Sequence, residues 1–102
     1  MRPEPALTHE AHADVLKAVD YYNTQSPGLG FDFLDEFEDS ISLIREVPLL
    51  FTLVDAPIRR ALVRRFPYGV FYVPGSDDAP DVVVAVVDLH QDPELVRRAY
   101  RR

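Results

Sequence analysis

The chain has no cysteine, and no apolar run approaches the length of about 18 residues that a membrane-spanning helix needs. The first absence excludes a disulfide framework and a thiolate metal site, and it fits a reducing compartment. Residues 1–5 also lack the apolar stretch of a signal peptide. We therefore expect a cytoplasmic protein with no membrane contact, no metal and no cofactor.

Lysine is scarce as well, since Lys17 is the single one and the other ten basic residues are arginines. Residues 1–58 carry three basic and eleven acidic side chains, a net charge of −8, whereas residues 59–102 carry eight arginines and six acids, a net charge of +2. The overall charge of −6 argues against nonspecific coating of nucleic acid, which needs a broad positive field. A local arginine site for carboxylate or phosphate stays open, with salt bridges to the acidic half as the alternative.

The first half of the chain predicts two helices. Apolar residues recur at helical spacing in residues 9–24, after Thr8 as a plausible N-cap. A second helix is predicted over residues 27–46, with Ser26 as N-cap, and it stops before Pro48. Because only a few residues join the two segments, they should form an antiparallel hairpin.

The second half changes to the alternation of strands. After a loop at 48–57, three strands are predicted at residues 58–66, 69–74 and 81–89, followed by a short helix at 93–101. Together with a short strand or arm at 4–7, these segments make one α+β domain over residues 1–102. We expect the helical hairpin to pack on one face of a small antiparallel sheet, with the short C-terminal helix after it.

The last strand carries the strongest hint of an interaction surface. Residues 82–87 are apolar on both faces of the pleat, which is typical of a strand covered on both sides. The hairpin covers only one face, so the C-terminal helix, a second copy or a partner protein must cover the other. In the first strand, Arg60 and Arg64 should share one face with Leu62, while Arg59 and Arg65 point to the opposite face.

Several short motifs, in order, resemble the RelE/ParE family of bacterial toxins, the toxin half of type II toxin–antitoxin (plasmid stabilisation) pairs. The resemblance covers residues 6–98, and its motifs are Tyr21-Tyr22-Asn23, Ser26-Pro27-Gly28-Leu29-Gly30, Arg65-Phe66-Pro67-Tyr68, and Val84 to His90 followed by Asp92-Pro93. One departure stands out. Many family members carry an arginine-rich turn where only Gln91 separates His90 from Asp92 here.

The resemblance implies a cognate antitoxin as partner and one of two cellular targets. A ParE-like toxin inhibits growth by binding DNA gyrase without chemistry of its own, and the net charge of −6 favours this reading. The alternative is a RelE-like, metal-independent endoribonuclease that cleaves messenger RNA on the ribosome. A second alternative is a non-toxic member that acts only as a protein-binding module. A homodimer, or a heterotetramer with the antitoxin, is compatible with each.

Candidate site residues differ between these readings. A ribonuclease would use His90 as acid or base, Arg60, Arg64 and Arg98 to hold the phosphate, and Tyr100 as a second acid. Its competitors are a surface histidine at a turn and arginines in ordinary salt bridges. A partner-binding surface would be formed by residues on the sheet, namely Arg60, Leu62, Arg64, Tyr72, Val84 and Val86.

Overall fold

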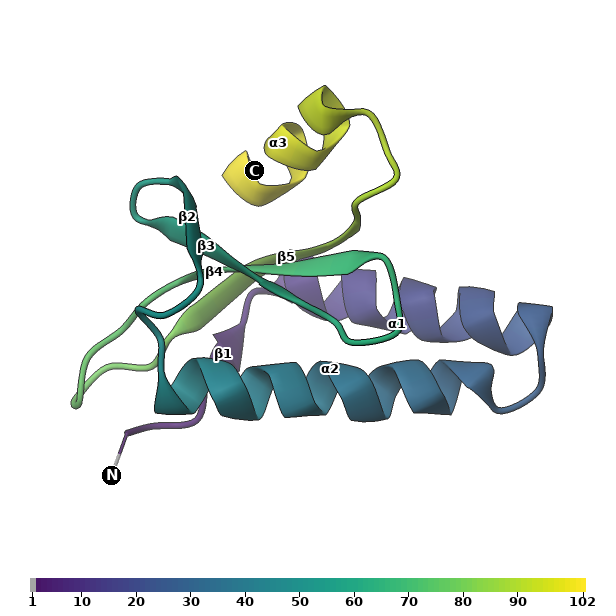
Figure 1. Ribbon diagram of the computed structural model, residues 1–102, viewed down its shortest axis with the longest axis horizontal. Helices are drawn as coiled ribbons and strands as arrows, with labels where there is room; N and C mark the ends of the chain where they lie inside the picture. The colour runs from purple at the N-terminus through teal and green to yellow at the C-terminus, as the bar shows by residue number, and fades with distance from the viewer. Residues whose placement is uncertain (1) are drawn as a thin grey trace.

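The computed structural model describes residues 2–102 as two helices on one face of a sheet and one helix on the other (Figure 1). In chain order the elements are β1 (Ala6–Leu7), α1 (His9–Gln25), α2 (Leu29–Glu46), β2 (Thr52–Asp55), β3 (Ile58–Leu62), β4 (Tyr68–Val73), β5 (Val82–Asp88) and α3 (Pro93–Arg101). The predicted α+β class, hairpin and C-terminal helix are confirmed. Within the described residues, no helix is both long enough and apolar enough to cross a bilayer.

The ends of the hairpin helices follow from their capping residues. Thr8 caps α1 as predicted, because its hydroxyl accepts a hydrogen bond from the backbone N–H of Ala11 at 3.1 Å. The prediction for the second helix was two residues too early. Ser26 caps the C-terminus of α1, and Gly28 adopts the left-handed conformation (φ 87°) before α2 begins at Leu29.

Gly30 sets how closely the two helices approach. Its backbone N–H donates to Oδ1 of Asn23 at 2.8 Å, across the turn of the hairpin. A Cβ atom at this position would lie 2.2 Å from the backbone oxygen of Val19 and 2.7 Å from Cγ of Asn23. Only glycine fits at this contact without separating the helices.

The sheet has five strands in the order β1-β5-β4-β3-β2. The central strands β3, β4 and β5 form the predicted antiparallel meander, and β1 pairs in parallel with the start of β5 through Ala6 and Val82. The prediction missed β2, a four-residue edge strand inside the segment expected to be a loop. It also made β3 too long, because the strand ends at Leu62 and Arg65 turns the chain with a φ of 73°.

Each face of the sheet has its own apolar cluster. The hairpin covers the larger one, which contains Phe33, Ile44, Val70, Tyr72 and Val83. The other face carries a smaller cluster, which comprises Phe71, Ala85, Val87 and Tyr100 with partly buried neighbours such as Val84. An irregularity in the pairing of β4 with β5 shifts the register here, so that Val84 and Ala85 both belong to the second cluster.

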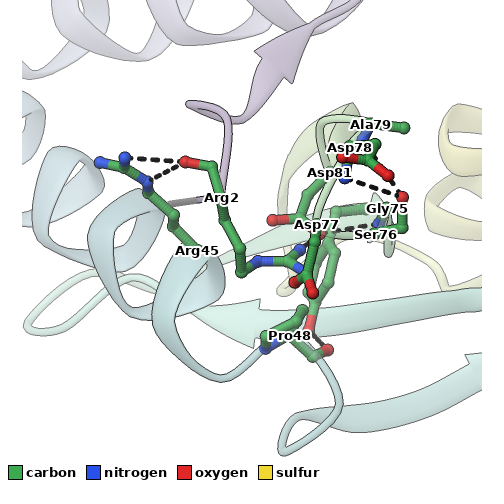
Figure 2. Close-up of polar contacts among 10 residues, drawn as sticks. Arg2, Arg45, Pro48, Gly75, Ser76, Asp77, Asp78, Ala79 and Asp81 are labelled. Atoms are coloured by element: carbon green, nitrogen blue, oxygen red, sulfur yellow. Dashed lines mark hydrogen bonds and ion pairs between the residues drawn. The ribbon is translucent and has the colours of Figure 1, made fainter.

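A buried carboxylate, that of Asp81, joins the N-terminal arm to the start of β5 (Figure 2). Asp81 is fully buried, and its Oδ1 accepts hydrogen bonds from Nη2 of Arg2 at 2.6 Å and from the N–H of Gly75 at 2.8 Å. The carbonyl of Arg2 in turn accepts from Nε of Arg45 at 3.0 Å. These bonds hold the arm, the loop before β5 and the end of α2 together.

Gly30→Ala should lower the free energy of unfolding by about 2–3 kcal/mol, because the added methyl group overpacks the contact between α1 and α2. Elsewhere in a helix the same change stabilises by about 1 kcal/mol. Ser42→Ala, at an exposed position of the same helix, is the control and should leave stability unchanged or slightly higher. Urea unfolding followed by circular dichroism measures both. A Gly30→Ala protein as stable as the wild type would contradict the close contact.

Candidate partner-binding site

The C-terminal helix α3 lies over the second face of the sheet and is held there by a few specific contacts (Figure 1). The ring of Tyr100 stacks on Phe71 with centroids 4.8 Å apart. The Tyr100 hydroxyl donates to Oδ2 of Asp55 at 3.1 Å, and Arg101 forms an ion pair with the same carboxylate. The last residue, Arg102, pairs with Asp14 of α1 at 2.6 Å.

This short helix leaves a crevice along each of its sides. One crevice, of about 290 Å³, lies between α3 and strands β2 to β4 and includes Arg60 and Phe71 in its lining. The other, of about 460 Å³, lies between α1, β5 and α3 and includes Lys17 and Tyr68. Gln91 lines both. The chain's own tail therefore supplies only part of the cover that the second face requires.

Of the four arginines between residues 59 and 65, Arg59 and Arg65 have polar partners within the protein. Arg59 points toward the hairpin side, where its Nη1 donates to the backbone oxygens of Phe51 at 2.8 Å and Leu49 at 3.2 Å. Arg65 lies 3.8 Å from the carboxylate of Glu36, and its guanidinium is 5.7 Å from the centroid of the Phe66 ring. Arg59 therefore bonds to the loop before β2, and Arg65 contacts a carboxylate of α2.

Arg60 and Leu62 remain available on the side of α3, and Arg64 lies in the turn that follows β3. Arg60 is half-buried, and its guanidinium makes no hydrogen bond or ion pair with any residue from 2 to 102; its Nε is fully buried without a partner. Leu62 is 59% exposed, and Arg64 just beyond it is exposed. Val84 is half-buried against the second cluster. These four residues stay in the proposed partner-binding set.

Tyr72 and Val86, by contrast, were wrongly assigned to that surface. Both face the helical hairpin and are buried, at 0% and 3% exposure. The hydroxyl of Tyr72 donates to the carbonyl of Pro48 at 2.5 Å, and desolvation raises the pKa of Tyr72 to about 12. The sequence did not reveal this because both faces of β4 and β5 are apolar, so alternation alone could not say which face the hairpin covers.

The residues proposed for ribonuclease chemistry are not gathered in one place. The side chain of His90 is 81% exposed at the end of β5, and its nearest charged neighbour is Asp88 at 4.0 Å. Arg98 is 73% exposed, 3.8 Å from Glu94. His90 lines neither crevice, and of the five candidates only Arg60 and Tyr100 share one.

The arginine that completes this crevice was missed in the sequence. Arg97, not Arg98, lines the crevice with Arg60 and Tyr100. Its spacing of three residues from Tyr100 was the available signal, because residues three apart lie on the same face of a helix.

Comparison with known proteins now places the architecture. No family model and no curated protein sequence matches the chain. Among solved structures, a chain described as "Chromosomal ParDE TA system from P. aeruginosa" superposes with a TM-score of 0.72, covering 84% of this chain and 95% of that one. This chain has the RelE/ParE fold. At 13% sequence identity the similarity concerns the fold, and the architecture that the motifs implied is confirmed.

In this version of the RelE/ParE fold, Asp55 should control how firmly α3 is docked. Hydrogen bonds from Arg101 and Tyr100 lower the pKa of Asp55 below its ordinary value of 3.8. Because the folded pKa is the lower one, this contribution is complete above about pH 4 and is lost as the pH falls through the lowered pKa. Amide NMR shifts of α3, followed from neutral pH downward, should therefore move together at acidic pH.

Asp55→Asn should speed hydrogen exchange of the α3 amides at neutral pH, since a neutral amide holds Arg101 less firmly. Asp78→Asn is the matched control, because Asp78 is exposed in the loop before β5 and its side chain forms no ion pair among the described residues. Unchanged exchange in Asp55→Asn would show that the Tyr100 stacking and the Arg102–Asp14 ion pair hold the helix without Asp55.

Proposed function

We propose that this protein is the toxin of a type II toxin–antitoxin system, of the ParE-like kind. It acts in the cytoplasm, inhibits growth by binding DNA gyrase, and is neutralised by a cognate antitoxin. The observation that carries the proposal is the RelE/ParE fold combined with nuclease candidates that do not converge on one site. The solved chain that shares the fold is named as part of a ParDE TA system, which supports the same class.

The surface chemistry favours binding over RNA cleavage. Cleavage needs a positioned acid or base together with cations on the phosphate, but His90 is mostly exposed and forms no contact with an arginine among the described residues. Gln91, where many members of the family carry an arginine-rich turn, lines both crevices and brings no charge to either. The net charge of −6 further weakens attraction to ribosomal RNA.

The antitoxin surface is the side of the sheet that α3 only partly covers. There Leu62 is exposed between Arg60 and Arg64 in the sequence, and the half-buried Val84 lies two strands away on β5. Apolar side chains and arginines on one face suit a segment that carries both apolar and acidic side chains and becomes ordered on binding. Symmetric pairing of two such complexes would give a heterotetramer.

Purified protein added to DNA gyrase should inhibit supercoiling, and induced expression should arrest growth and produce gyrase-linked DNA breaks. Coexpression of the protein encoded by the adjacent gene should relieve the arrest. Supercoiling assays on plasmid DNA and growth curves measure both effects. Full gyrase activity at a large excess of the protein would contradict the gyrase target.

His90→Ala separates this proposal from the ribonuclease alternative. The variant should still arrest growth as strongly as the wild type, because an exposed histidine can be truncated without disturbing the fold. Loss of arrest, with intact messenger RNA only in the variant, would establish the RelE-like activity instead. Absence of arrest in the wild type itself would leave a protein-binding module without toxicity.

A further inference from the structure

The crevice between α3 and strands β2 to β4 combines apolar walls with positive charge. Its walls come from Val54, Phe71, Leu89 and Val96, and its charges come from Arg60 and Arg97. At about 290 Å³ it is at the lower limit of small-molecule pockets, which span about 300–1,000 Å³. The space suits one large side chain rather than a complete cofactor.

Arg60 is the residue that points to a ligand. Among residues 2–102 its guanidinium has no carboxylate or carbonyl partner, and its buried Nε has no hydrogen bond. The three other half-buried arginines, Arg2, Arg45 and Arg59, each have a partner, although Nε of Arg2 is also buried without a hydrogen bond. A partly buried charge without a partner is costly, so a missing acceptor is the simplest explanation of this arrangement.

The floor of the crevice is shaped around the stem of Arg60. A Cβ atom at Gly69 would lie 3.2 Å from Cγ of Arg60 and 3.0 Å from the ring of Phe71. Glycine at this position lets the arginine stem lie flat on β4 beside the Phe71 ring. Arg97, which forms an ion pair with the exposed Glu94 at 3.4 Å, borders the same space from α3.

The apolar walls decide which acceptor fits. A nucleic-acid phosphate would bring a polar sugar into contact with valine and phenylalanine side chains, and the net charge of −6 opposes it. A carboxylate beside an apolar side chain matches both the arginine and the apolar walls of the crevice, because a guanidinium binds carboxylate through two parallel hydrogen bonds. The larger crevice is less suited to a carboxylate, since its lining contains Asp14 and Asp88 beside Lys17, and Arg102 there is already paired with Asp14.

We propose that this crevice binds a peptide segment of a partner protein in which a leucine or phenylalanine stands next to a glutamate or aspartate. The apolar side chain enters between Phe71 and Val96, and the carboxylate pairs with Arg60. The inference rests on the proposed toxin function, because it specifies the chemistry of the antitoxin segment that covers this face.

The test uses two fluorescein-labelled octapeptides, identical except at one position. The first carries a single glutamate between two leucines in a serine and glycine background, and the second carries glutamine in place of the glutamate. Anisotropy titrations compare the wild type with Arg60→Met, which keeps the apolar stem and removes the charge. Arg98→Met is the matched control, because it removes the same charge from an exposed position of α3 outside the crevice.

The wild type should bind the glutamate peptide at least about tenfold more tightly than the glutamine peptide, as a charge-assisted hydrogen bond allows. Arg60→Met should abolish this preference, whereas Arg98→Met should keep it. Amide NMR shifts on addition of the peptide should concentrate in β3, β4 and α3. Circular dichroism should show that all three proteins are equally folded.

Equal affinity for the two peptides, a preference that survives Arg60→Met, or binding to neither peptide would overturn the inference. So would tighter, Arg60-dependent binding of a labelled RNA hexamer. These outcomes are independent of gyrase inhibition and growth arrest. A chain that arrests growth but shows no glutamate preference refutes this site alone, and a chain with the preference but no toxicity refutes only the proposed function.

Discussion

The need to cover both faces of β5 governs the rest of the structure. Its residues are apolar on each side, and the helical hairpin can reach just one of them. The other side depends on α3, a helix of nine residues whose main apolar contact is Tyr100 stacked on Phe71. A helix this short cannot form without tertiary contacts. The second cluster is buried under this one short helix, and a crevice remains along each side of the helix.

Ion pairs join the acidic first half of the chain to the arginine-rich second half. Acidic residues of the first half bind arginines of the second, as Asp14 does with Arg102, Asp55 with Arg101 and Glu36 with Arg65. These pairs tie α3 and the β3–β4 turn to the remainder of the fold. Arg60 stands outside this scheme because it forms no ion pair with any carboxylate of residues 2–102 and lines a crevice with mostly apolar walls. Its unpaired charge is the reason for proposing a binding surface here.

The elements predicted correctly from the sequence are those whose patterns depend on residues close together in the chain. Helical spacing and Thr8 located α1, and alternation located the meander, because each pattern reflects burial within a few residues. The prediction failed for elements whose position depends on contacts between residues far apart in the chain. β2 forms because β3 offers it an edge to pair with, and α2 begins at Leu29 because Gly28 must reverse the chain. The same limit applies to the site: strand alternation placed Arg60 and Leu62 on one face of β3, but it could not place Arg64, which lies beyond the end of the strand. Tyr72 and Val86 required knowing which face the hairpin takes.

Amide hydrogen exchange of the chain, free and in complex with its neutralising partner, tests the central claim most directly. If the half-covered face is the binding surface, the partner should protect β3 and α3 and leave the solvent-facing amides of the hairpin unchanged. Protection confined to α1 and α2, with β3 and α3 exchanging as in the free chain, would contradict it.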